Sequence, residues 1–401
     1  MPRKIYGLIS AACTIGIICY SWVGFSQTSR PSVRLATNPT IEKIRPFEAE
    51  ATEALGSGKY QSPVQLTLQA IDARGQALKN ARIRLQILTP PKSPWFTTDF
   101  PIVEGTKLLD VEGNAPTGEF QVKQSLPIRG TYRLLVDVTP IVPNSFAPVQ
   151  QTIALSVPEH GAKYRNLGIL VCILLVAGFG GGWVIGSRKP TQPGEIVPEP
   201  VRLLMSGAIV VAIAALLFVN LSAEFAHSHE SHDRGEHLPR SSPPSKVQSQ
   251  GLEMKLSGDT TAAVGRPAQL QVSVIDTKTQ QPVTDVALKV TTTALENNWV
   301  AFAYESAPDS TGKLVWKQQF FDGAPHRIDV EVTPQVGATR KFQPFQVGQT
   351  IPVEGVAPPL SVRLISLAYL TGVVGIGLLL GLWLSQKHNK RLQQDWKRSF
   401  S

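Results

Sequence analysis

Histidine and acidic side chains are concentrated in one short segment, and these residue types bind transition metals. The segment EFAHSHESHDRGEH, residues 224–237, holds four of the seven histidines of the chain. Neutral imidazole and carboxylate groups suit Zn²⁺, Ni²⁺ or Cu²⁺. The sequence therefore predicts a divalent transition-metal site whose ligands are His227, His229, His232, His237 and Glu236.

Two geometries would let this segment hold an ion. In a helix, His229, His232 and Glu236 share one face, whereas in an extended chain His227 and His229 would chelate. The segment runs into RSSPPSKVQSQ, a Pro/Ser-rich stretch that does not fold by itself. A plain hydrophilic linker is therefore the competing interpretation, and a tether that responds to pH is a third.

Four apolar runs place this segment next to a membrane. They are Ile5–Phe25, Leu167–Gly186, Leu203–Leu221 and Leu364–Leu384, and none contains Asp, Glu, Lys or Arg. Each is long enough for a helix to cross about 30 Å of hydrocarbon. They explain why only 17% of the chain is charged, against about 25% in soluble domains. We expect four transmembrane helices, the first being either an uncleaved signal anchor or a cleaved signal peptide.

Basic residues predict the orientation in the bilayer. Positive charges before the first run, between the second and third, and after the fourth fall on one side if the N-terminus is cytoplasmic. Residues 27–165 and 222–361 then both face outward, as in a multi-pass protein of the bacterial inner membrane with periplasmic domains. The net charge of +9 reflects this topology, and no nucleic-acid partner is expected because no soluble segment has a basic, aromatic-rich stripe.

Both exterior segments are predicted to be β-structure, because apolar and polar residues alternate with a period of two. The expected strands are 64–72, 81–88, 117–124 and 131–140 in the first segment, and 268–276, 285–292, 311–318 and 325–334 in the second.

The two segments also resemble each other. VQLTLQAID matches AQLQVSVID, while Thr117-Gly118 matches Thr311-Gly312 and TYRLLVDVTP matches PHRIDVEVTP at a constant offset of 194 residues. Internal duplication explains this. The fold class is therefore expected to be two all-β, immunoglobulin-like sandwiches plus transmembrane helices, without disulfides, since all three cysteines lie in apolar runs.

The expected domain organisation follows the chain from end to end. It comprises a signal anchor or first transmembrane helix (1–26), a linker (27–45), the first sandwich (46–157), a transmembrane helix (167–186), a cytoplasmic loop (187–202), a transmembrane helix (203–221), a His-rich and Pro/Ser-rich linker (222–248), the second sandwich (249–346), a transmembrane helix (362–385) and a basic cytoplasmic tail (386–401). The pairs Gly178/Gly182 and Gly377/Gly381 allow close helix packing, within one chain or in a homodimer.

One stretch resembles a known family. FFDGAPHRIDVEVTP, residues 320–334, looks like the end of the YtkA-like domains, which are related in shape to FixH and CopC-like immunoglobulin folds. The resemblance covers 250–340 and, more weakly, 50–142. It implies metal handling in the envelope, because FixH-like proteins are associated with copper supply to oxidases and CopC-like proteins bind copper. The chain departs from the family in having two domains and several spans, and in lacking an N-terminal histidine on either domain.

No enzyme signature is present: G-x-S-x-G, P-loop, H-E-x-x-H and zinc CxxC pairs are all missing. Asp72 and Asp276 are expected to cap turns, and His326 is expected to be structural or on the surface. The prediction is a non-enzymatic membrane protein that acts as an accessory or binding module for transition-metal handling, in efflux or oxidase assembly, beside a membrane or periplasmic protein partner. The alternative is a structural or assembly subunit whose sheet edges accept a partner strand and whose His tract is a spacer.

Overall fold

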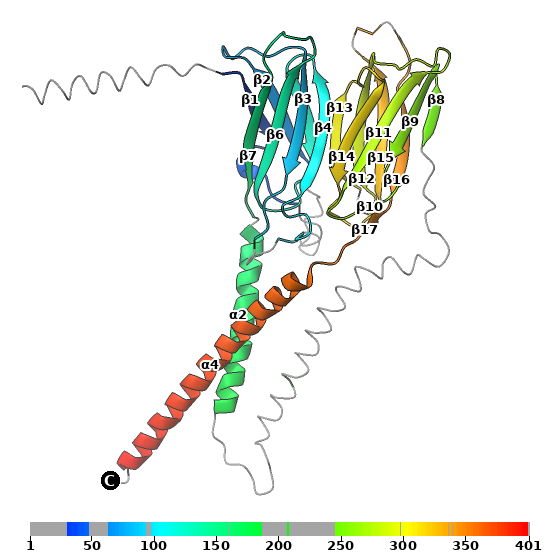
Figure 1. Cartoon of the computed structure of the whole chain (residues 1–401). Coiled ribbons are helices and arrows are strands. Elements are labelled where there is room, and N and C mark those ends of the chain that lie inside the picture. The colour runs from blue at the N-terminus through cyan, green and yellow to red at the C-terminus, as the bar shows by residue number, and fades with distance from the viewer. Residues whose placement is uncertain are drawn as a thin grey trace, which may run out of the picture.

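The computed structural model describes residues 30–47, 63–93, 98–159, 161–186, 207 and 245–399, apart from 297, 336 and 339. Antiparallel β-sheet is the main regular structure among these residues, and two long helices leave the same end of the sheets (Figure 1). The expectation of a mainly β-protein with apolar helices is confirmed.

The strands of the two halves follow the alternation of the sequence. In β3, the side chains of Ala81, Ile83, Leu85 and Ile87 are buried, while those of Arg82 and Arg84 face outward. The first half contains β1 (Ser32–Asn38), the short helix η1 (Ile41–Lys43), β2 (Val64–Ile71), β3 (Ala81–Leu88), β4 (Lys107–Ala115), β5 (Glu119–Gln124), β6 (Gly130–Pro140) and β7 (Val149–Val157). The second contains β8 (Lys246–Ser249), β9 (Leu252–Gly258), β10 (Ala262–Ala263), β11 (Pro267–Asp276), β12 (Val286–Ala294), β13 (Trp299–Ser306), β14 (Lys313–Gln319), β15 (His326–Pro334), β16 (Phe345–Ile351) and β17 (Val353–Glu354).

The two halves are joined edge to edge, so the expectation of two separate sandwiches is not confirmed. One sheet has the order β1-β2-β5-β13-β12-β15-β16 and the other β7-β6-β3-β4-β14-β11-β9-β8, so each sheet passes through both halves. The halves join where β5 pairs with β13 and β4 pairs with β14, both antiparallel. We call these four strands the seam. The seam covers strand edges that separate sandwiches would leave open.

The seam has a continuous apolar interior. Trp316 and Phe302 are fully buried there, and both halves contribute to one core. Gly113 leaves room for this packing, because a β-carbon on it would lie 2.5 Å from the Phe120 ring and 2.7 Å from Ser306 Oγ. The same Ser306 hydroxyl accepts a hydrogen bond from the Asn114 backbone N–H at 3.2 Å.

Strand β1 lies in the region expected to be a linker, residues 27–45. Its residues pair with β2 from Ser32 opposite Ile71 to Asn38 opposite Gln65. SVRLATN alternates like the other strands, but it is separated from its partner by 25 residues. The alternation that is typical of a strand was therefore visible in the sequence, but its pairing with β2 was not.

The helices are α2 (Gly161–Gly186) and α4 (Leu360–Ser399). Within them, Lys163–Gly186 (24 residues) and Leu360–His388 (29 residues) are long and apolar enough to cross a membrane. Two of the four apolar runs thus form such helices; the other two lie outside the described residues, except Gly207. The segment 386–401, expected to be a tail, is helical as far as Ser399.

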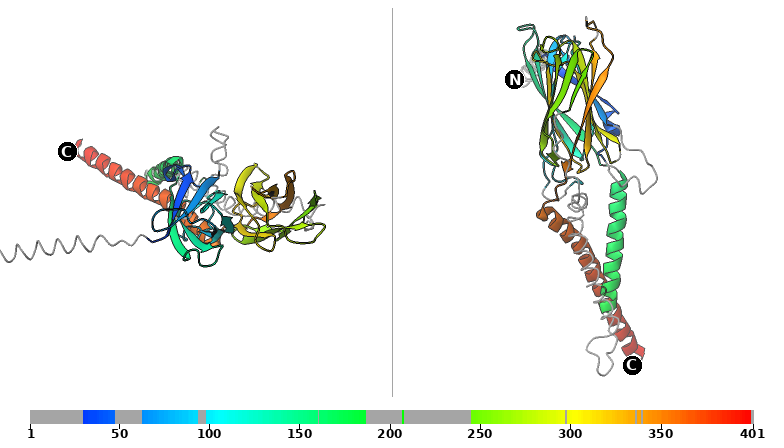
Figure 2. Two further views of the ribbon diagram at one scale, coloured as in Figure 1. Left: turned by 90° about the horizontal axis from the view of Figure 1, so that it is seen from above. Right: turned by 90° about the vertical axis from the view of Figure 1, so that its right-hand side faces the viewer.

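The glycine pairs of the two helices pack against each other. A β-carbon on Gly178, Gly182 or Gly381 would overlap a backbone carbonyl of the opposite helix. One on Gly377 would lie 2.5 Å from the carbonyl oxygen of Leu175. Only glycine permits this approach, so the intramolecular alternative for these pairs is confirmed. Figure 2 shows the helices crossing below the sandwich.

Candidate functional site

The predicted metal ligands His227, His229, His232, His237 and Glu236 all lie outside the described residues. Among the described residues, no three His, Cys, Asp or Glu side chains are grouped so as to hold a metal ion. The metal site at residues 224–237 therefore stays a prediction.

His326 is part of the core, as the structural interpretation expected. Its side chain is only 1% exposed, with Nδ1 2.7 Å from the Ala324 carbonyl oxygen. The rings of Phe320 and Trp299 lie 4.8 and 5.9 Å from the imidazole. Burial lowers the pKa of His326 to about 4, although the bond to Ala324 opposes this shift. The ring is therefore neutral near pH 7.

Tyr132 occupies the matching position of the first half, 194 residues earlier. Its hydroxyl donates to the Ile128 carbonyl at 2.7 Å and accepts from the Ile128 backbone N–H at 2.9 Å. Burial raises the pKa of this phenol far above its ordinary value. Both side chains thus fix the chain at the start of the corresponding strand of their half, β6 or β15.

Asp72 and Asp276 cap turns, as predicted. Asp72 Oδ1 accepts from the backbone N–H groups of Arg74 and Gln76, both at 2.8 Å. Asp276 Oδ1 accepts in the same way from residues 278 and 279. The Arg340 guanidinium, which donates to Asp276, lowers the pKa of that carboxyl to about 2.

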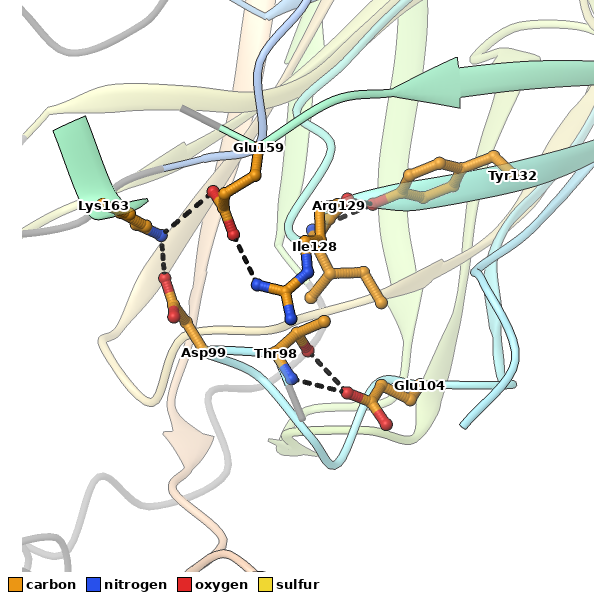
Figure 3. Close-up of polar contacts among 8 residues, drawn as sticks. All are labelled: Thr98, Asp99, Glu104, Ile128, Arg129, Tyr132, Glu159 and Lys163. Carbon is orange, nitrogen blue, oxygen red and sulfur yellow. Dashed lines mark hydrogen bonds and ion pairs between the residues drawn. The ribbon is translucent and has the colours of Figure 1, made fainter. Parts of the chain in front are cut away.

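A cluster of charged residues, the base network, connects α2 to the first half. It consists of Asp99, Arg129, Glu159 and Lys163 (Figure 3). Glu159, whose side chain is 5% exposed, accepts a hydrogen bond from Arg129 Nη1 at 2.7 Å. Its other carboxylate oxygen lies 3.6 Å from Lys163 Nζ. Lys163 in the first turn of α2 also pairs with Asp99.

The loop that carries Asp99 is itself held in place. The backbone N–H and the hydroxyl of Thr98 both donate to Glu104 Oε1 at 2.8 Å, and Glu104 is almost fully buried (Figure 3). Because buried carboxylates are costly unless they are paired, these contacts fix the geometry. The base network therefore sets the direction in which α2 leaves the sandwich, and no motif in the sequence indicated it.

The second half holds the start of α4 through its backbone. Strands β10 and β17 pair in parallel, and the Val264 N–H donates to the Glu354 carbonyl at 3.0 Å. Gly323 and Gly355 approach so closely that a β-carbon on Gly323 would be 3.0 Å from the Gly355 Cα. Both helices are therefore connected to the same end of the sandwich.

Aromatic side chains join the halves at this end. Phe47 of the first half stacks near Trp299 and Phe321 of the second, with ring centroids 4.3 and 5.4 Å apart. Phe100, from the loop beside Asp99, meets Phe321 at 5.5 Å. Ring contacts of this kind contribute about 0.5–1.5 kcal/mol beyond area burial, so they stabilise the junction between the halves at this end.

An open groove of about 670 Å³ lies on the outer face of the eight-stranded sheet, across the seam. Lys107 of the first half and Lys317 of the second border it, together with Gln269 and Gln271. Lys107 is engaged by Asp110 at 3.0 Å. The groove offers polar contacts, but the described residues in it show no nucleophile paired with a base.

The opposite, distal end presents turns and two closed sheet corners. The Gln151 side chain pairs with both backbone groups of Val33, at 2.7 and 3.1 Å. Gln250 does the same to the backbone of Gln343, at 2.8 and 3.0 Å. Each amide therefore satisfies backbone groups between neighbouring edge strands, which disfavours addition of a partner strand at those places.

The turn between β6 and β7 exposes apolar side chains at this distal end. Ile141 is 41% and Val142 55% exposed, between Pro140 and Pro143. The Ile141 backbone N–H is bonded to the Asn80 carbonyl at 2.9 Å, so the base of the turn is fixed. We call residues 140–143 the apolar tip.

No family model matches the sequence, and no curated protein matches it. Among solved structures, the chain is similar to α-2-macroglobulin from Escherichia coli (10% identity, TM-score 0.21), covering 80% of this chain and 16% of that one. It is also similar to invasin, a bacterial integrin-binding protein (7%, TM-score 0.19, 82% and 40%), and to the adhesin InvE of Yersinia pseudotuberculosis (11%, TM-score 0.18, 81% and 61%). The chain thus spans only part of these proteins, and TM-scores this low carry no argument. The YtkA-like resemblance stays a prediction.

Proposed function

We propose that this chain is a non-enzymatic integral membrane protein of the bacterial inner membrane that holds a rigid β-platform on the periplasmic side and binds another envelope protein there. The observation that carries the proposal is that α2 and α4 both leave one end of a continuous two-sheet sandwich (Figure 1). With both helices in the membrane, both halves lie on the same side. The basic residues near the other ends of the membrane segments favour the cytoplasm, which leaves the two halves on the exterior side.

Rigidity supports an assembly role. The base network, the aromatic contacts of Phe47 and the glycine crossing each restrict how the sandwich moves on its helices. A module that merely tethers a partner needs none of these connections. A module that presents a surface at a fixed height and angle above the bilayer needs all of them.

The apolar tip is the surface we assign to the partner. It lies at the end of the sandwich opposite the helices, where Ile141 and Val142 are exposed on a turn whose base is held by the Ile141–Asn80 backbone hydrogen bond. A photo-crosslinking residue in place of Val142 should give one discrete adduct in native membranes. Gln335, in the corresponding turn of the second half, is the matched control position. Equal labelling at both positions, or none at Val142, would refute this assignment.

Transition-metal handling is the second candidate, and the His tract at residues 224–237 is the observation that favours it. Equilibrium dialysis of the full chain with Zn²⁺, Ni²⁺ and Cu²⁺ tests it. Replacing His227, His229, His232 and His237 with Ala should abolish binding if the tract is a site. A Gly/Ser replacement of 224–237 at equal length should leave an assembly subunit functional but inactivate a metal module.

A further inference from the structure

The contacts between α2 and α4 are reciprocal. Gly178 approaches the carbonyl of Val374, and Gly377 approaches that of Leu175. Gly377 lies 199 positions after Gly178, and Val374 lies 199 after Leu175. Gly182 with Leu378 and Gly381 with Phe179 repeat the relation at the same offset. A contact in which residue i meets j while the equivalent of j meets the equivalent of i is the signature of a two-fold axis.

The seam obeys the same symmetry. By the 194-residue offset, β14 corresponds to β5, and β13 takes the place of β4 before the shared Thr-Gly turn. In the structure β5 pairs with β13 in one sheet, and β14 pairs with β4 in the other. A rotation that places each half on the other would therefore also place each sheet on the other. Gln124 and Gln318, 194 positions apart, are both buried at the seam, one in each sheet.

We infer that the chain is a fused dimer made of two modules, each a sandwich half with its helix. The two modules bind each other noncovalently. They do so through a self-complementary surface, which fits a second module of the same kind. The first module is residues 30–186 and the second is residues 245–388. The surface has two parts, the seam and the glycine crossing, on one approximate two-fold axis that runs along the helices. This inference is independent of the proposed partner protein.

The inference explains why an additional apolar run, residues 203–221, lies between the two modules. Because the axis runs along the helices, α2 and α4 run in the same direction, as the pairing of Gly178 with 374 and of Gly182 with 378 requires. A chain that ends the first module on one side of the bilayer must cross back before it starts the second. The apolar run 203–221 has the length for that return.

A protease site placed between Thr191 and Gln192 of the full chain tests the inference after folding is complete. Once it is cleaved in detergent, the two fragments should still elute as one particle with unchanged near-ultraviolet circular dichroism. Separation of the fragments under native conditions would overturn the inference, because the linker would then be what holds the modules together.

The symmetry itself is tested by leucine variants of the cleavable protein, measured as the rate of fragment dissociation. Gly182→Leu and Gly381→Leu should accelerate it to a similar extent, by at least about tenfold, which corresponds to about 1.4 kcal/mol. Gly180→Leu and Gly375→Leu are matched controls, since nothing lies within 4 Å of a β-carbon there. Before cleavage, each variant must show the same circular dichroism signal for β-strands as the wild-type protein. Unchanged rates in both test variants, or equal acceleration in the controls, would overturn the claim.

Discussion

The buried imidazole of His326 should make the sandwich sensitive to mild acid. Its pKa is about 4 in the folded protein and about 6.5 in an unfolded chain, so the unfolded state binds the proton more readily. Stability is therefore complete above pH 6.5 and falls as the pH drops towards 4. The expected loss in the free energy of unfolding is about 1.4 kcal/mol at pH 5.5 and about 3 kcal/mol at pH 4.

The effect of His326 on stability falls at a higher pH than the effects of the carboxylates. Asp276 has a pKa lowered to about 2, and the pKa values of Asp110 and Asp309 are lowered as well. For Asp110, burial would raise the pKa, but hydrogen bonds from Arg84 and Lys107 outweigh it. Such groups stabilise the fold above the unfolded pKa of about 3.9 and lose that contribution only below it.

Urea unfolding of the detergent-solubilised full chain, followed by tryptophan fluorescence between pH 7.5 and 4.5, measures the effect. His326→Gln keeps a side-chain donor for the Ala324 carbonyl and should flatten the pH profile, whatever it does to stability at pH 7. His388→Gln, on α4 outside the sandwich, should reproduce the wild-type profile. If His326→Gln keeps the wild-type slope, the imidazole is not the source and the reasoning fails.

Three further changes test the seam, a turn and a sheet corner. Asp110→Asn weakens hydrogen bonds from three side chains and should lower the free energy of unfolding in urea by about 1–2 kcal/mol. Its control is Glu112→Gln, in a half-exposed ion pair at 3.5 Å, which should lower it by less than about 0.5 kcal/mol. Gly118→Ala places a β-carbon 2.8 Å from the Leu78 carbonyl at a φ of 82° and should cost about 2–3 kcal/mol; Gly75→Ala, at φ 81° in open space, should cost about 1 kcal/mol. Gln151→Leu removes the partner of an edge strand and should increase light scattering at equal concentration; unchanged scattering would contradict the role given to that amide.

Local patterns in the sequence identified much of the fold. The period-two alternation of 81–88 coincides with β3 residue for residue, and the aspartates at 72 and 276 cap turns through contacts within four residues. The glycines at 178, 182, 377 and 381 were visible as helix-packing positions. In each case the information lies within a few residues of the chain, because period, turn chemistry and helix register are local properties.

The sequence did not identify the seam, and it offered two domains instead. Nothing in the alternation of β5 and β13 indicates that they pair, since any amphipathic strand presents the same backbone donors and acceptors to a neighbour. Glu159 and Arg129, 30 residues apart, likewise showed no motif, and their contact exists only once β6 and β7 have paired.

The amino-acid sequence by itself indicated eight of the strands, the two helices that are apolar enough for a bilayer, and the duplication of the β-structure. Only the tertiary structure decided that the duplicates share two sheets, that His326 is enclosed and that both helices are connected to one rigid base. The physical reason is sequence separation. Periodicity and hydropathy depend on neighbours along the chain, whereas the seam pairs residues that are about 180 to 210 positions apart.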